Sequence, residues 1–153
     1  MILTGETLKN AIAIQLMKSM PELNVYKESI STPKFPHCVI SLLNINCSEE
    51  RKGYYLLSYN FMLQYRVVAD LSSYSKLQQA LDRASLIFME TFDLLKVDDE
   101  YVRCTDKSTE KSEGILLFNF NIKLLVNKID LENLGKVDKM RILDYNVYIK
   151  ENK

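Results

Sequence analysis

The side chains best suited to chemistry in this sequence are one histidine and two cysteines near it. His37 stands directly before Cys38, and Cys47 follows in the same apolar segment. A zinc site usually needs four ligands in closely spaced pairs, and the chain has a single histidine. Adjacent residues on a strand point to opposite faces, so His37 is poorly placed to activate the thiol of Cys38. We interpret these residues as parts of a strand and expect no metal and no cofactor.

A second candidate is the acidic group Asp98, Asp99 and Glu100. Carboxylates of this kind can bind a cation or act as a general base, but these three lack the ligand spacing of a calcium loop. The four glycines are scattered along the chain, whereas a phosphate-binding loop gathers them in one segment. The sequence therefore predicts a protein that is not an enzyme.

The charge balance and the aromatic residues bear on possible partners. Lys plus Arg number 20 and Asp plus Glu number 20, so the chain lacks the basic excess typical of nucleic-acid binders. Tyr59 and Tyr65 fall on the apolar side of their segment, away from any open stacking face. We expect no specific nucleic-acid partner. The odd number of cysteines, with no signal-peptide or membrane-span pattern, predicts a soluble protein with free thiols, made in the cytoplasm.

The elements that must position these residues are organised around the segment Tyr54–Val68, YYLLSYNFMLQYRVV. Its odd positions from Leu57 to Val67 are apolar, and four of the even positions between them are polar. A period of two over this length predicts a strand with one face on the core and the other on water or a partner. The segment Ile115–Val126 alternates in the same way and predicts a second long strand.

Two helices are expected beside these strands. Thr4–Met20 has an N-cap threonine and an apolar face on which Gln15 is the only polar residue. The second helix starts at Ser73 or Ser75 and runs to about Leu95. Two further strands are expected to be short, Val25–Ile30 and Tyr101–Thr105. A third, His37–Cys47, has apolar groups on both faces, which is typical of a central strand.

Charged turns separate the strands into two hairpin arms. The first turn is Ser48–Gly53, SEERKG, and the second is Asp106–Gly114, DKSTEKSEG. A polar linker follows the last long strand, and Arg141–Lys150, RILDYNVYIK, alternates again as a strand. Long strands with apolar atoms on more than one face need cover, which either the chain itself or a neighbouring subunit can provide.

The predicted fold class is therefore α+β, a mainly antiparallel sheet with two long hairpin arms, two helices packed on one face and an extra C-terminal strand. We expect residues 1–128 to form a single domain. Residues 129–153 are a linker and a strand, which belong to the same domain or dock on a neighbouring subunit.

This layout resembles the small tail terminator proteins, also called tail-completion or neck-collar proteins, of Gram-positive phages and phage-like contractile particles. The resemblance lies in the opening LKNAIAIQLMKSMPELNVYKESI, the loop and strand PKFPHCVISLL, the strand YYLLSYNFMLQYRV, the helix after it and the closing RILDYNVYIK. It covers most of the chain. These segments are patterns of apolar, proline and aromatic positions without a catalytic signature.

The resemblance implies a subunit of a six-fold ring that caps the head-proximal end of the tail tube and, in contractile tails, anchors the last sheath layer. Its partners would be copies of itself, the tail tube protein and a sheath protein. It would assemble in the host cytoplasm and remain in the particle. The residues expected to face a tube or sheath protein are the charged ones of the two turns, Glu49, Glu50, Arg51, Lys52, Lys107, Glu110, Lys111 and Glu113.

Two alternatives stay open at this point. One is a head–tail connector or adaptor subunit of the same particle. The other is an α+β module that binds a small molecule or nucleic acid.

Overall fold

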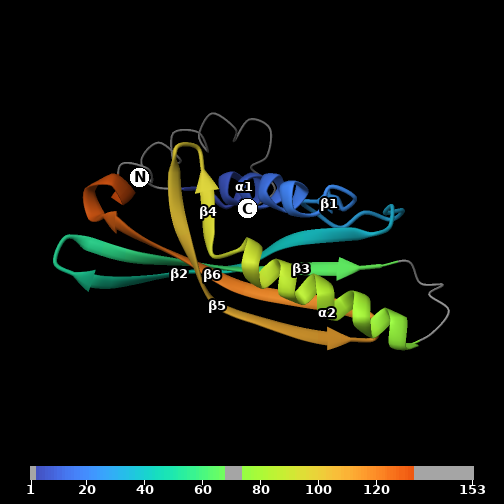
Figure 1. Cartoon of the computed structure of the whole chain (residues 1–153). Coiled ribbons are helices and arrows are strands. Elements are labelled where there is room, and N and C mark those ends of the chain that lie inside the picture. The colour runs from blue at the N-terminus through green and yellow to red at the C-terminus, as the bar shows by residue number, and fades with distance from the viewer. Residues whose placement is uncertain (1–2, 68–73, 133–153) are drawn as a thin grey trace, which may run out of the picture.

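The computed structural model describes residues 3–67 and 74–132 (Figure 1). Its elements, in chain order, are α1 (Gly5–Ser19), β1 (Asn24–Tyr26), β2 (His37–Arg51), β3 (Tyr54–Arg66), α2 (Tyr74–Thr91), β4 (Leu94–Val97), β5 (Glu100–Ser112) and β6 (Ile115–Asn127). Residues 128–132 are helical and follow β6 directly. Within these ranges no helix has the length and apolarity that a membrane span requires.

The strands form one curled sheet in the order β1-β2-β3-β6-β5-β4 (Figure 1). The short pair β1 and β2 is parallel, and every other neighbouring pair is antiparallel. Both helices cover the same face of β3, because Tyr59 donates a hydrogen bond to the Leu3 carbonyl just before α1, and Tyr65 packs edge-on against Phe88 of α2. The α+β class and the packing of helices on the sheet are confirmed.

The segment Tyr54–Val68 behaves as its alternation predicts. On β3 the odd residues from Leu57 to Tyr65 are buried, and the even residues between them are partly exposed. β6 pairs with β3 along its whole length and buries its own alternate residues on the same face. The centre of the core is a cluster of five phenylalanines from these strands and α2's end, namely Phe61, Phe88, Phe92, Phe118 and Phe120.

The first helix begins and packs as expected. The Thr4 side chain accepts a hydrogen bond from the Thr7 amide at 3.1 Å, which caps the helix start. The apolar stripe, with Leu8 and Leu16 fully buried, faces the core. Gln15 on this stripe links α1 to the end of α2 and the start of β4. Its Nε2 donates to the carbonyls of Thr91 at 2.6 Å and Leu94 at 2.8 Å, and its Oε1 accepts from the Lys96 amide at 3.2 Å.

The end of the second helix differs from the prediction. α2 ends at Thr91, and the residues from Leu94 to Val97 form β4. Leu95 is buried as expected, but from a strand that pairs with Val102 of β5. The apolar spacing up to Leu95 also fits a helix, so pairing with a distant strand decides the conformation of this short segment.

The predicted turn Asp106–Gly114 is wrong. β5 runs through most of it to Ser112, with an irregularity between Thr105 and Ser108, and the turn is only the step from Ser112 to Ile115. Gly114 has a φ of 79°, which suits a tight hairpin turn. The charged composition indicated a loop, but the strand's charges find partners on neighbouring elements, as described below. β2 likewise extends past Cys47 to Arg51, and β1 is shorter than Val25–Ile30.

The central position predicted for His37–Cys47 is wrong for most of that strand. β1 pairs with β2 only from His37 to Val39, so within the described residues β2 from residue 40 to 51 has no neighbour on its outer side. Leu43 and Ile45 on this part are 48% and 50% exposed. We call residues 40–51 the open edge. The predicted strand Arg141–Lys150 lies outside the described residues.

Candidate functional site

The two hairpin turns lie at opposite ends of the sheet, and Lys107, Glu110 and Lys111 stand on β5 before the second turn. β3 and β6 pair from Tyr54 with Asn127 to Arg66 with Ile115. The turn between β2 and β3 therefore stands beside the end of β6, and the turn between β5 and β6 beside its beginning. Thirteen-residue strands place the two turns about 40 Å apart along the sheet. The eight charged residues thus form two separate surfaces.

The first surface, the β2–β3 tip, consists of Glu49, Glu50, Arg51 and Lys52. All four side chains are exposed. The Arg51 guanidinium lies 4.7 Å from the centre of the Tyr54 ring, which holds this cation against the hairpin. Beside the tip, the Lys128 amide donates to the Gly53 carbonyl at 2.9 Å. The chain that follows β6 therefore leaves the sheet at this end.

The second surface is more involved in the protein's own packing. Lys107 Nζ donates to the Met89 carbonyl at 3.1 Å, and Lys111 forms an ion pair with Asp82. Both lysines therefore fasten β5 to α2. Glu110 lies opposite Leu117 and faces the other side of the sheet. That these residues meet a partner stays a prediction. The two lysines already have a role within the chain, since both bind α2.

The middle of the sheet face away from the helices is polar across four strands, whereas Leu56 and Leu125 lie on this face nearer the β2–β3 tip. One row runs from Asn44 through Asn60 and Asn121 to Thr105. Next to it, Asp106 accepts a hydrogen bond from Asn121 at 3.1 Å and lies 3.3 Å from Lys123 Nζ. These two contacts hold the pKa of the Asp106 carboxyl below its usual value. Such a face suits water or a polar partner surface.

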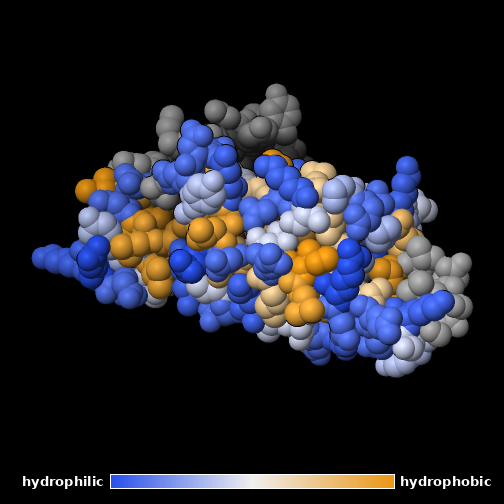
Figure 2. Space-filling view, in the orientation of Figure 1, coloured by the Kyte–Doolittle hydropathy of each residue, from blue (hydrophilic) through white to orange (hydrophobic). Residues whose placement is uncertain are grey.

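The open edge has one apolar side and one polar side. Ile45 and Cys47 pair with Tyr59 and Leu57, whose side chains lie on the helix-covered face. Asn44 and Asn46 point to the opposite face. Figure 2 shows apolar surface among charged groups on the side where Figure 1 draws the β2–β3 hairpin and the end of β6. The run of apolar residues in HCVISLLNINC was the sequence signal for this feature, although we interpreted it as a central strand.

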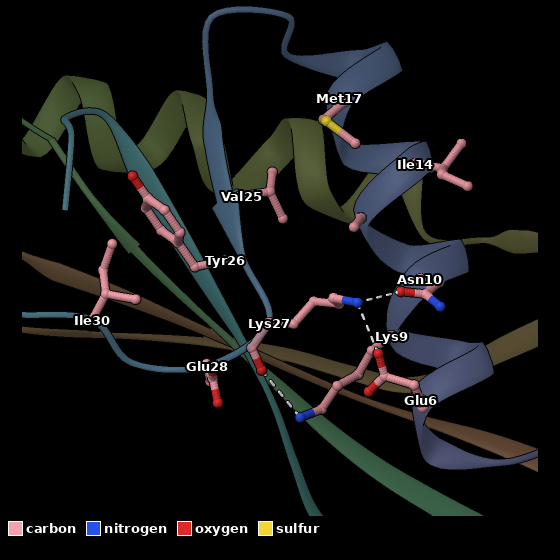
Figure 3. Close-up of a pocket in the computed structure, with 11 residues that line it drawn as sticks. Glu6, Lys9, Asn10, Ile14, Met17, Val25, Tyr26, Lys27, Glu28 and Ile30 are labelled. Carbon is pink, nitrogen blue, oxygen red and sulfur yellow. Dashed lines mark hydrogen bonds and ion pairs between the residues drawn. The ribbon is translucent and has the colours of Figure 1, made fainter.

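A groove of about 850 Å³ lies between α1 and residues 25–30 (Figure 3). Its apolar wall includes Ile14 and Met17, which are 53% and 48% exposed. At its charged end, Lys27 Nζ lies 2.8 Å from Glu6 and donates to Asn10 at 2.8 Å. The hydrogen bond from Lys27 lowers the pKa of Glu6. The sequence signal for this groove was the position of Ile14 and Met17, two apolar residues off the apolar stripe of the helix.

The residues that first suggested chemistry do not converge. His37 is 4% exposed, packs against the ring of Phe35 at 4.9 Å, and neither ring nitrogen has a hydrogen-bond partner among the described residues. Burial, together with Arg66, lowers its pKa. Cys38 is buried on the other face of β2, and burial raises the pKa of its thiol well above the usual value.

The remaining candidates are equally separate. Burial raises the pKa of the Cys104 thiol to about 12, so that thiol is not a ready nucleophile. Cys47 is exposed on the open edge. The described part of the chain holds no cluster of three or more His, Cys, Asp or Glu side chains that could bind a metal ion.

Comparisons with known proteins give one clear result. A family model described as phage tail terminator protein matches residues 7–133. A comparison with curated proteins gave no significant match. One solved structure without a descriptive name covers 75% of this chain and 92% of its own, at 7% identity and a TM-score of 0.28, a likeness too weak to support any conclusion. The family match spans both helices and the whole six-stranded sheet, and on that basis this chain belongs to the phage tail terminator family, whose members are structural components of the virion tail.

Proposed function

We propose that this chain forms a hexameric ring that caps the head-proximal end of a phage tail tube and stops its growth. The match of the tail terminator family to residues 7–133 carries this proposal. The same match favours a terminator over a head–tail connector. In a contractile tail the ring would also hold the last layer of sheath. It would assemble in the bacterial cytoplasm and stay in the particle.

The shape of the subunit supports this role. A cap needs one end that fits the tube and another that refuses further tube subunits. The sheet presents two different charged turns about 40 Å apart, so its ends can face different neighbours. A ring also needs a heterologous contact, in which two different surfaces of one chain fit each other and the rotation closes. The polar face, the open edge and the α1 groove supply such unlike surfaces.

We assign the β2–β3 tip to the tube. Its four charges are exposed and stand at the end of a paired hairpin, where a partner can reach them. Lys107 and Lys111 on β5 bind α2, which leaves the second surface fewer free cations. Complementary charges across such an interface set the specificity and the rate of docking more than the affinity.

The test reverses the four charges of the tip together, as Glu49→Lys, Glu50→Lys, Arg51→Glu and Lys52→Glu. The net charge does not change, and the side chains are exposed, so the folded structure and its thermal stability should be retained. Capping should be lost, which electron microscopy would show as long tubes with bare ends when tube protein polymerises beside this variant.

A matched control is the exchange Lys18→Glu with Glu22→Lys. Both residues are exposed, Lys18 in the last turn of α1 and Glu22 just after the helix. This variant also keeps the net charge and should cap like the unmodified protein. If the tip variant caps tubes as well as this control does, the assignment of the tip to the tube is wrong.

A further inference from the structure

The open edge of β2 lacks a partner strand over residues 40–51, within the part of the chain that the structure describes. Unpaired strand edges of this length are templates for another strand, and soluble proteins rarely leave them bare. Charged side chains blunt this edge only near its end, at Glu49, Glu50 and Arg51. In the middle it presents Leu43 and Ile45, each about half exposed.

The chain carries a segment whose pattern fits this edge. In residues 141–150, RILDYNVYIK, apolar residues alternate with polar ones. The open edge alternates as well, with Ile45 and Cys47 on the helix-covered side and Asn44 and Asn46 on the polar side. A strand added here would place its apolar residues beside Ile45 and its Asp and Asn beside the asparagines, which satisfies both faces at once.

The position and length of the chain allow this contact. The Lys128 amide is hydrogen-bonded to Gly53, so the C-terminal segment starts at the β2–β3 tip, at one end of the open edge. From residue 132 to residue 141 an extended chain spans up to about 30 Å, several times the spacing of neighbouring strands. Ten residues then extend over about 33 Å, close to the length of the edge.

We propose that residues 141–150 of one subunit add as a strand to the open edge of β2 in the next subunit. This inference rests on the proposed ring. A closed ring needs two unlike surfaces of one chain that fit each other, and the open edge and this segment are such a pair. Each subunit then gives one strand and receives one, which covers Ile45 and fills the open edge of β2 in every subunit of the ring.

The experiment uses the exposed native Cys47 as a reporter on the apolar side of the edge. Full-length variants carry one added cysteine, at Tyr145, Val147 or Ile149 on the apolar side of the segment, or at Asp144 or Asn146 on its polar side. A disulfide requires the two Cα atoms within about 7 Å and side chains on the same face. After mild oxidation, gels without reductant separate links within one chain from links between chains.

We expect at least one of the three apolar-side variants to give dimers and a ladder of larger species, and the ladder to be lost in D144C, in N146C and after Cys47→Ser. Links within single chains would overturn the exchange between subunits while leaving the ring possible. Equal ladders from both sides of the segment, or none from any variant, would overturn the strand pairing. Electron microscopy of the same samples reports rings independently, so absent rings would count against the proposed function itself.

Discussion

Replacing Gln15 is the sharpest test of how the helices are held on the sheet. This side chain is the one polar residue on the packing face of α1, and it makes hydrogen bonds to Thr91, Leu94 and Lys96. Gln15→Met keeps the length and volume of the side chain and removes all three bonds. The end of α2 and the start of β4 then lose their direct link to α1.

The size of the effect follows from the three bonds. Each contributes about 0.5–1.5 kcal/mol net, and a carbonyl or amide left without a partner in a buried position costs about 1–3 kcal/mol. Because the contacts to Leu94 and Lys96 are accessible to water, part of this cost is recovered by hydration. We expect Gln15→Met to lower the free energy of unfolding by about 1–3 kcal/mol, with a fall in Tm of roughly 2–12 °C.

A second variant, Gln15→Glu, tests the same contacts through the pH dependence of stability. At neutral pH its carboxylate would face the carbonyl oxygens of Thr91 and Leu94, so this variant should be less stable than Gln15→Met. The folded state then favours the protonated carboxyl, so its pKa is raised. Stability should therefore be partly recovered as the pH falls toward the ordinary glutamate value of about 4.3, since a protonated carboxyl can donate.

Urea unfolding followed by circular dichroism measures these differences, with Lys18→Met on the exposed side of the same helix as the control. The control should stay within about 0.5 kcal/mol of the unmodified protein. If Gln15→Met matches the control, the hydrogen bonds of Gln15 do not hold the two layers together and this interpretation of the interface is refuted.

Two further predictions concern the core and the single histidine. Phe120 contacts three other phenylalanine rings, at 5.8, 5.1 and 5.5 Å, so Phe120→Ala should cost about 3–5 kcal/mol in urea unfolding, and a loss below about 1 kcal/mol would contradict the packing. The lowered pKa of His37 means that the unfolded chain takes up a proton before the folded one, so stability should fall as the pH drops below about 6.5. His37→Phe should flatten this dependence between pH 7.5 and 5.5, because His37 is the only histidine, and an unchanged slope would show that other groups cause it.

Strict alternation was the most reliable guide to the fold. It predicted the bounds of β3 and β6 to within two residues. A long strand buried on one face shows apolar residues at every second position, a pattern that a helix does not produce. Thr4 marked the start of α1 for a local reason that needs no tertiary context. Composition was a poorer guide: the charges of β5 indicated a loop, although Lys107 and Lys111 bind α2.

What the sequence could not show is the pairing of distant segments. Leu95 fits a helix by spacing and becomes part of β4 only because β5 lies beside it. The open edge depends on the shortness of β1, which pairs with only three residues of β2. The separation of the two charged turns depends on the register of β3 with β6, a property of the folded sheet alone.

The most direct test of the proposed function is electron microscopy of the purified protein mixed with tail tubes of its own phage. Rings of this protein, seated at one end of each tube and preventing further growth, are the expected result. A protein that stays monomeric at high concentration and leaves both tube ends bare and growing would contradict the proposed cap.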